Sequence, residues 1–247
     1  MFEIGIQLRE ELGEDNVFDL SLGNPVMEPP TEFLQELRRV VNDPETGKHR
    51  YMPNAGYNET RQAIASHLAE ETNLPYKPSN ILMSVGAGGG INVVLHALLN
   101  PGDEVIIFTP FFAEYLFYIY NHQGTPRIVE CDEQFIPDIQ DLEAKITPQT
   151  KVVMLNSPNT PSGVIYSNEF LKKLTDVLSR KAVDLGTEIF IISDEPYRKL
   201  IFDGLSYPFP QTIYDRTITV TSHSKDLAIP GERIGYVAIN PSYVDGG

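Results

Sequence analysis

A lysine near the end of the sequence stands among hydroxyl side chains, directly after an apolar run. Lys225 follows Ser222-His223-Ser224, and Arg233 comes eight residues later. A lysine amine can bond covalently to a carbonyl carbon and can then act as a base. A lysine in an exposed loop with no chemical role would give the same local pattern. The segment alone therefore leaves both interpretations open.

Two other segments place chemically useful groups after apolar runs. Gly86-Ala87-Gly88-Gly89-Gly90 leads into a helical stretch, where glycines let the backbone approach an anion and the helix N-terminus offers free N–H groups. A tight strand-to-helix turn without a ligand is the alternative. Asp194 and Tyr197 lie in Ser193-Asp194-Glu195-Pro196-Tyr197. A carboxylate at the end of a buried strand is costly unless it is paired, and helix capping is the alternative role.

Aromatic and turn-forming residues follow two further apolar runs. Phe111 and Phe112 could stack on a flat ring or pack in the core. The string Asn156-Ser157-Pro158-Asn159-Thr160-Pro161-Ser162-Gly163 is typical of a polar turn, and by composition alone a surface loop. We expect cis peptide bonds at Thr109–Pro110 and Thr160–Pro161, since cis bonds concentrate at X-Pro in tight turns.

The elements that would position these residues alternate between strands and helices. Short apolar runs at 81–85, 104–108, 151–155, 188–193 and 217–221 predict buried strands, with another at 233–240. Helical periodicity marks 31–41, 58–71, 91–99, a stretch near 112–122 and a helix capped by Ser167. This pattern predicts an α/β fold with a mostly parallel central sheet and helices on both faces. Ligands bind such sheets beyond the carboxyl ends of the strands.

Composition narrows the class of protein. The 247 residues carry a net charge of −15 and 41% hydrophobic residues, which supports a packed core. The acidic balance argues against nucleic acid and anionic membranes as partners. Cys131 is the single cysteine, and no signal peptide or long apolar run is visible, so we expect a cytoplasmic protein. We expect no metal site.

Taken in order, these motifs resemble the fold-type I pyridoxal-phosphate enzymes, and specifically the class I/II aminotransferases related to aspartate aminotransferase. The resemblance runs from about Leu20 to the end of the chain and depends most on Ser222-x-Ser224-Lys225, Arg233 and Ser193-Asp194-Glu195-x-Tyr197. It implies pyridoxal 5'-phosphate as cofactor, an α-amino acid and a 2-oxo acid as substrates, and a homodimer.

The resemblance also implies roles for single residues. Lys225 corresponds to the lysine that holds the cofactor as a Schiff base and moves the substrate proton. Asp194 corresponds to the partner of the pyridine nitrogen, and Tyr197 to a tyrosine that contacts the ring oxygen. The remaining implied contacts are Arg233, Ser222, Ser224, Ala87 and Gly88 with the phosphate, Phe112 with the ring face, Tyr51 with the phosphate of a neighbouring subunit, and Gly23 near the substrate.

The sequence departs from the family pattern in two places. The family loop has Asn where this chain has Thr160, so we expect the ring-oxygen contact to be weakened, water-mediated or taken over by Asn159. Family members also continue well past Gly247, and the resemblance puts the arginine that binds the substrate carboxylate in that part. We therefore expect a truncated chain.

This expectation gives a domain division and several functional alternatives. Residues 1–45 would form an N-terminal arm with part of an incomplete small domain, and 46–247 the large cofactor domain. We expect the helices at 31–41 and 58–71 to leave apolar surface uncovered. The predicted activity is amino-group transfer; the alternatives are a carbon–sulfur β-lyase, a ligand-sensing regulator domain and a cofactor-binding fragment without turnover.

Overall fold

The computed structural model describes residues 2–18 and 23–244 of the chain. Leu20, where the family resemblance begins, and Gly246-Gly247 lie outside these residues. Internal contacts divide the chain into two compact units, Met1–Asn42 and Asp43–Gly247. The first contains α1 (Phe2–Leu12), the short helix η1 (Glu14–Asn16) and α2 (Thr31–Asn42), and no residue of α2 is buried. The assignment of this unit to a small domain stays a prediction.

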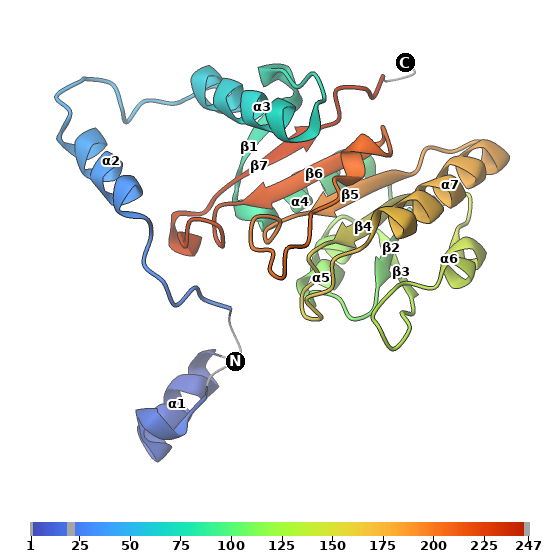
Figure 1. The fold of residues 1–247 in the computed structure, drawn as a ribbon, viewed down its shortest axis with the longest axis horizontal. Helices are drawn as coiled ribbons and strands as arrows, with labels where there is room; N and C mark the ends of the chain where they lie inside the picture. Colours follow the sequence, from blue (N-terminus) through green and yellow to red (C-terminus); the bar gives the residue numbers. More distant parts are fainter. Residues whose placement is uncertain (1, 19–22, 245–247) are drawn as a thin grey trace. The chain divides into compact units, whose positions relative to one another are not determined.

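The second unit is built on a seven-stranded sheet (Figure 1). Its strands are β1 (Ile81–Val85), β2 (Glu104–Phe108), β3 (Thr125–Val129), β4 (Thr150–Asn156), β5 (Phe190–Asp194), β6 (Thr217–Ser222) and β7 (Ile234–Ile239). The order across the sheet is β1-β7-β6-β5-β4-β2-β3. Neighbouring strands from β3 to β6 pair in parallel, and β7 pairs antiparallel with both β6 and β1. The predicted mostly parallel α/β fold is confirmed.

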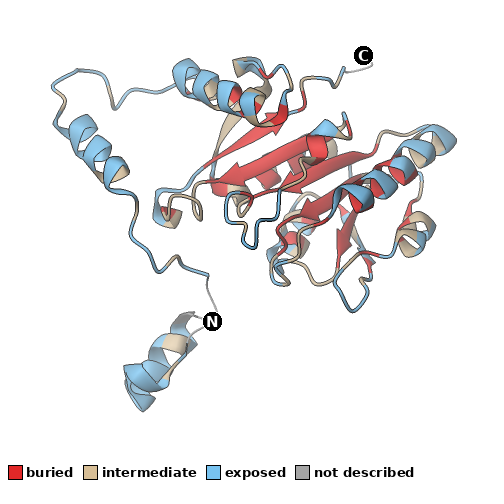
Figure 2. Cartoon of the chain, viewed as in Figure 1, coloured by how far each residue is buried: buried red, intermediate tan, exposed pale blue. Residues whose placement is uncertain are grey.

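Helices cover both faces of this sheet because successive strand residues point to opposite sides (Figure 1). In β4, Val153 and Leu155 pack with α6 (Ile139–Lys145) and α7 (Asn168–Leu185). Val152 and Met154 pack with α4 (Gly86–Leu98) and α5 (Glu114–Asn121) on the other face. The central strands are therefore buried except at Lys151 (Figure 2), as a continuous apolar run predicts.

Helix α3 (Asn58–Thr72) covers the part of the sheet formed by β1 and β7, on the same face as α6 and α7. Its residues Ala65 and Leu68 pack on Ile81, Tyr236 and Ala238. The expectation that this helix leaves its apolar side uncovered is wrong, because β7, the last strand in the sequence, supplies its partner. Within the described residues, no helix is long and apolar enough to cross a bilayer.

Several local expectations differ from the structure. The helix expected from residue 91 begins at Gly86, so the glycine run forms its first turn. Strand β3 and helix α6 were not predicted. Ser167 caps α7 as expected, by accepting a hydrogen bond from the Phe170 amide. Both predicted cis bonds, Thr109–Pro110 and Thr160–Pro161, are present, together with a third at Ser157–Pro158.

The short helices complete the connections of the second unit. They are η2 (Pro78–Asn80), η3 (Pro210–Thr212) and η4 (Pro230–Glu232). The last of these leads directly into Arg233, whose φ of 53° is in the left-handed region. This turn reverses the chain before β7.

Candidate active site

The direction of the strands brings the candidate residues together at the carboxyl ends of the parallel strands, which we call the site edge of the sheet. The carboxyl ends of β1, β4, β5 and β6 lie at this edge, and each is followed by one of the chemically interesting segments. Because β7 runs antiparallel, it begins where the others end. Val85 is opposite Ile234, so Arg233 joins the same edge from the far end of the sequence.

Asp194 is the last residue of β5 and is almost wholly buried. Its Oδ2 accepts a hydrogen bond of 2.5 Å from the hydroxyl of Tyr115 on α5, and its Oδ1 is buried with no protein partner. Burial raises the pKa of Asp194 to about 6, and the hydrogen bond from Tyr115 opposes this rise. The carboxyl group thus has one fixed oxygen and one oxygen left for a ligand.

Lys225 lies in the turn after β6, half-buried. Its Nζ is 5.6 Å from the centre of the Tyr197 ring, so these two predicted residues come together. Ser222 is buried and its hydroxyl donates to that of Ser224 at 3.1 Å. His223 and Asp226, on either side of Ser224 and Lys225, are linked at 3.1 Å and hold the turn closed.

The first turn of α4 and Arg233 form the candidate anion site. Gly86 has a φ of 67°, and a methyl group added there would lie 2.6 Å from Nη2 of Arg233. A methyl group on Gly88 would lie 2.9 Å from the Tyr118 hydroxyl. The glycines therefore let a guanidinium and a phenol approach a helix N-terminus, where free N–H groups attract anions. Ala87 lies in this turn between them.

The polar loop after β4 is held by its own side chains. Asn156 is buried, donates to the Asp194 carbonyl at 3.1 Å and accepts from the Thr160 amide at 2.6 Å. Asn159 is also buried; its Oδ1 accepts from Ser162 and its Nδ2 donates to the Pro110 carbonyl at 3.3 Å. These contacts give Asn159 a structural task, so the ring-oxygen contact expected of Asn159 or Thr160 stays a prediction.

The remaining predicted residues lie in different surroundings. Phe112 is exposed, with its ring edge-on to that of Tyr115 at 5.6 Å between centres. Tyr51 is exposed and lines a cleft of about 670 Å³ whose wall also includes Arg233. Gly23 lies in the first unit and is exposed. Its predicted contact with substrate is not tested by these observations.

Sequence reasoning missed three residues that hold the site. Tyr115 donates a hydrogen bond to the Asp194 carboxylate, and Asn156 donates one to the Asp194 backbone carbonyl. Arg198 is buried and forms ion pairs with Glu195 at 3.8 Å and with Glu71 at 3.0 Å. In the helix predicted near 112–122, Tyr115 would share a face with Phe112, three residues earlier, although in the structure α5 begins only at Glu114. That was the one available signal. The contacts of Asn156 and Arg198 depend on strand pairing and on α3.

The chemistry of these donors fits pyridoxal phosphate. An unpartnered buried carboxylate oxygen suits a protonated ring nitrogen, a lysine amine suits an aldehyde, and a helix N-terminus beside Arg233 suits a phosphate. The described residues contain no cluster of three or more His, Cys, Asp or Glu side chains arranged to bind a metal.

Comparison with known proteins agrees with this chemistry. The family model for aminotransferase class I and II matches residues 15–246. The chain is 32% identical over 229 residues to the probable aspartate aminotransferase of Methanocaldococcus jannaschii, covering 93% of this chain and 58% of that protein. It is 35% identical to the probable aspartate/prephenate aminotransferase of Aquifex aeolicus, covering 92% and 57%. The chain thus spans less than two thirds of the length of these relatives.

Solved structures give the same result. An aminotransferase from Eubacterium rectale aligns with a TM-score of 0.94 at 38% identity, covering 99% of this chain and 62% of that one. Aspartate aminotransferase from Thermus thermophilus, solved with maleate, aligns with a TM-score of 0.84 at 31% identity, covering 96% and 60%. The match extends over nearly all of this sequence and includes the sheet edge described above. The chain belongs to the family of class I and II aminotransferases.

Proposed function

We propose that this chain binds pyridoxal 5'-phosphate and takes part in the transfer of an amino group between an α-amino acid and a 2-oxo acid. One observation carries the proposal. Asp194 keeps one buried oxygen without a protein partner on the same sheet edge as Lys225 and Arg233. A buried carboxylate in that state needs a cationic or donor partner, and a protonated pyridine nitrogen is such a partner.

Each residue at this end of the strands would have its own role in the reaction. The cofactor, when bound, supplies a ring that accepts the electrons left when the substrate loses its α-proton. Lys225 would hold the aldehyde carbon and afterwards move the α-proton with its free amine. Asp194 would keep the ring nitrogen protonated, and Tyr197, beside the Lys225 amine, would contact the ring oxygen.

Phosphate binding would fall to the groups around α4. The amides of Ala87 and Gly88 lie in its first turn, and Arg233 presents a guanidinium beside Gly86. A planar guanidinium binds phosphate through two parallel hydrogen bonds. Ser222 and Ser224 would add hydroxyl donors, and Phe112 would cover the ring face. Gly23 would lie near the substrate.

A homodimer is part of the proposal. Tyr51 is exposed beside the cleft that Arg233 also lines, and we propose that it reaches the phosphate bound by a neighbouring subunit. The relatives named above act, by their names, on aspartate and prephenate; because the chain spans less than 60% of their length, its own substrate pair is proposed only by class.

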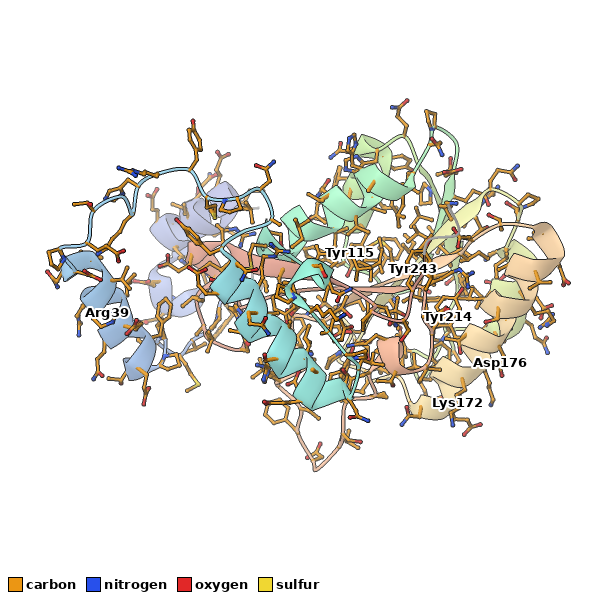
Figure 3. The ribbon with its side chains drawn as sticks, turned by 90° about the horizontal axis from the view of Figure 1, so that it is seen from above. Arg39, Tyr115, Lys172, Asp176, Tyr214 and Tyr243 are labelled. Carbon is orange, nitrogen blue, oxygen red and sulfur yellow. The ribbon has the colours of Figure 1, made fainter. Side chains whose placement is uncertain are left out.

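The covalent attachment is tested directly by reduction. Purified protein is mixed with pyridoxal phosphate, reduced with borohydride, digested and mapped by mass spectrometry. We expect the label on Lys225 and its loss in Lys225→Ala. Lys172, exposed on α7, provides the control: Lys172→Ala should retain the label at Lys225 (Figure 3).

Label on another lysine, or no label with cofactor in excess, would contradict the proposal. Release of pyruvate and ammonia from an amino acid, without a 2-oxo acid acceptor, would instead favour a lyase on the same fold.

A further inference from the structure

Tyr115 is the nearest described protein donor to the proposed cofactor-binding carboxylate. It is 2% exposed, on the face of α5 that packs against the sheet, and its hydroxyl contacts Oδ2 of Asp194 at 2.5 Å. Its ring edge also packs against Phe112. Tyr115 therefore touches both the residue proposed to hold the ring nitrogen and the residue proposed to cover the ring face.

We propose that Tyr115 is a positioning residue that fixes the rotation of the Asp194 carboxylate and stabilises its charge, leaving Oδ1 for the pyridine nitrogen. This inference rests on the proposed function and adds a residue to it. The division of the two oxygens supports it: one accepts the phenol, and the other is buried without a partner.

The Asp194 carboxylate and the pyridine nitrogen would share one proton, and the more basic of the two groups holds it. A hydrogen bond from Tyr115 stabilises the ionised carboxylate and lowers its basicity, so the proton between Asp194 and the ring stays on nitrogen. Without that donor, the buried carboxylate is a stronger base and draws the proton to itself. A ring nitrogen that has lost its proton is a weaker electron acceptor.

The surrounding charges do not supply a substitute for this donor. Tyr118 interacts electrostatically with Asp194, but among the described residues the hydrogen bond to this carboxylate comes from Tyr115. Glu195, the next residue in the chain, carries the same sign as Asp194 and disfavours a second negative charge. The burial of Asp194 acts in the same direction. Tyr115 is thus the described group that opposes these effects.

The experiment reads the protonation of the ring nitrogen. Protein is loaded with pyridoxal phosphate carrying ¹⁵N in the ring, and its ¹⁵N chemical shift is recorded over a pH series. We expect Tyr115→Phe to move the signal toward the value of unprotonated pyridine at a given pH. We also expect it to weaken cofactor affinity about tenfold, as the loss of one hydrogen bond to a charged group implies.

Tyr214→Phe is the matched control. Tyr214 (labelled in Figure 3) is also buried, and its hydroxyl donates to the Ile189 carbonyl at 2.7 Å, so this variant loses one buried hydrogen bond that does not involve Asp194. It should leave the ¹⁵N shift at the parent value. Melting curves of both variants, followed by circular dichroism, give the stability that each change costs.

A second variant changes the donor without removing it. Replacing Tyr115 with 3-fluorotyrosine makes the phenol a stronger donor at nearly constant shape. We expect its ¹⁵N signal to move opposite to that of Tyr115→Phe, toward the protonated value. A purely structural role would not produce opposite shifts.

The outcomes separate this inference from the proposal on which it rests. Parent protein that binds cofactor, with an unchanged ¹⁵N shift and affinity in Tyr115→Phe, would overturn the role of Tyr115 alone. Parent protein that gives no signal from bound cofactor would overturn both.

Discussion

Asp194 illustrates how a single buried side chain can indicate its missing ligand. An ionised carboxylate loses several kcal/mol of hydration when it is buried, and partners must replace that hydration. In this chain Tyr115 replaces part of it at Oδ2, and Oδ1 is left over. A cationic ring nitrogen would complete the set and stabilise the charged form.

Removal of this carboxylate should separate cofactor binding from chemistry. We expect Asp194→Ala to retain some cofactor, because the phosphate contacts and Lys225 are unchanged. We expect the rate of α-proton exchange in D₂O, measured by NMR, to fall by roughly three powers of ten, which is equivalent to an increase of about 4 kcal/mol in the activation free energy. Asp176→Ala, on the exposed face of α7, should exchange at the parent rate (Figure 3). Parent-rate exchange in Asp194→Ala would show that the carboxylate has another role.

The sequence predicted the residues that stand next to an apolar run in the chain. Lys225 and Asp194 lie at or just after the carboxyl ends of parallel strands, so the rule for ligand sites in such sheets locates them without any knowledge of partners. Arg233 precedes the antiparallel strand β7, and only the family resemblance indicated its role. Tyr115 could not be found this way, because its contact joins residues 79 positions apart. Such contacts depend on how α5 packs on the sheet, which periodicity alone does not determine.

The turn from Glu195 to Arg198, which contains Tyr197, makes contacts with α3, β5 and β7. Arg198, buried, contacts Glu71 on α3 at 3.0 Å and donates to the Tyr236 hydroxyl on β7 at 3.1 Å. Glu195 accepts from Ser193 at 2.7 Å. Burial raises the pKa of Glu195 to about 7, although Arg198 opposes the rise. Ionised Glu195 therefore destabilises this turn near neutral pH.

This raised pKa predicts how stability depends on pH. A carboxyl with a folded pKa above its unfolded value stabilises the fold below the unfolded pKa and loses that contribution as pH rises through the folded pKa. The window for Glu195 runs from its ordinary 4.5 to about 7. As the pH rises through this window, the free energy of unfolding of Glu195→Gln should increase relative to that of the parent by on the order of 1–3 kcal/mol, measured by urea unfolding. Glu133→Gln, in an exposed loop, should follow the parent; an equal response in both variants would refute the assignment.

Helix α4 depends on glycine because other elements lie against its first turns. A methyl group on Gly90 would lie 2.8 Å from Val220 and 3.1 Å from Val237. Alanine gains about 1 kcal/mol in helix propensity, but overpacking of a tight core costs roughly 1–3 kcal/mol. We expect Gly90→Ala to lower the free energy of unfolding by about 1 kcal/mol. Gly231→Ala, where nothing lies within 4 Å, should be neutral by the same denaturation assay; a stabilised Gly90→Ala would contradict the packing argument.

The same packing explains why the start of α4 was misplaced from sequence. Glycines have low helix propensity, so the run Gly86–Gly90 indicated a loop, although tertiary contacts select glycine there for its small size. Strand β3 was missed for a related reason. Its burial pattern is mostly exposed and it contains Pro126, so it lacks the apolar run that identified the central strands. Edge strands accept both features.

The activity of the 247-residue polypeptide follows from how much of the family architecture it contains. It spans 58% of the Methanocaldococcus jannaschii relative, and the resemblance puts the carboxylate-binding arginine outside the matched part. A bidentate arginine cannot be replaced by scattered hydroxyls, so substrate orientation should be poor. We expect slow half-reactions with a panel of amino acids, followed by absorbance, in protein that binds cofactor normally.

Cofactor binding by the same preparation is the control for that assay. Efficient turnover would mean that a carboxylate partner lies within these residues. Arg50 would then be the first side chain to replace, because it lines the cleft beside Arg233.

The position of β1 has a consequence for synthesis on the ribosome. This strand, the first of the sheet to be made, pairs in the described structure with β7, the last. Val85 and its partner Ile234 are separated by 149 residues (234 − 85). Contacts of such long range form late, after loop-closure entropy has been overcome. A nascent chain therefore cannot assemble the anion site between α4 and Arg233 until nearly all of this sequence has emerged, so ligand capture there would report a completed sheet.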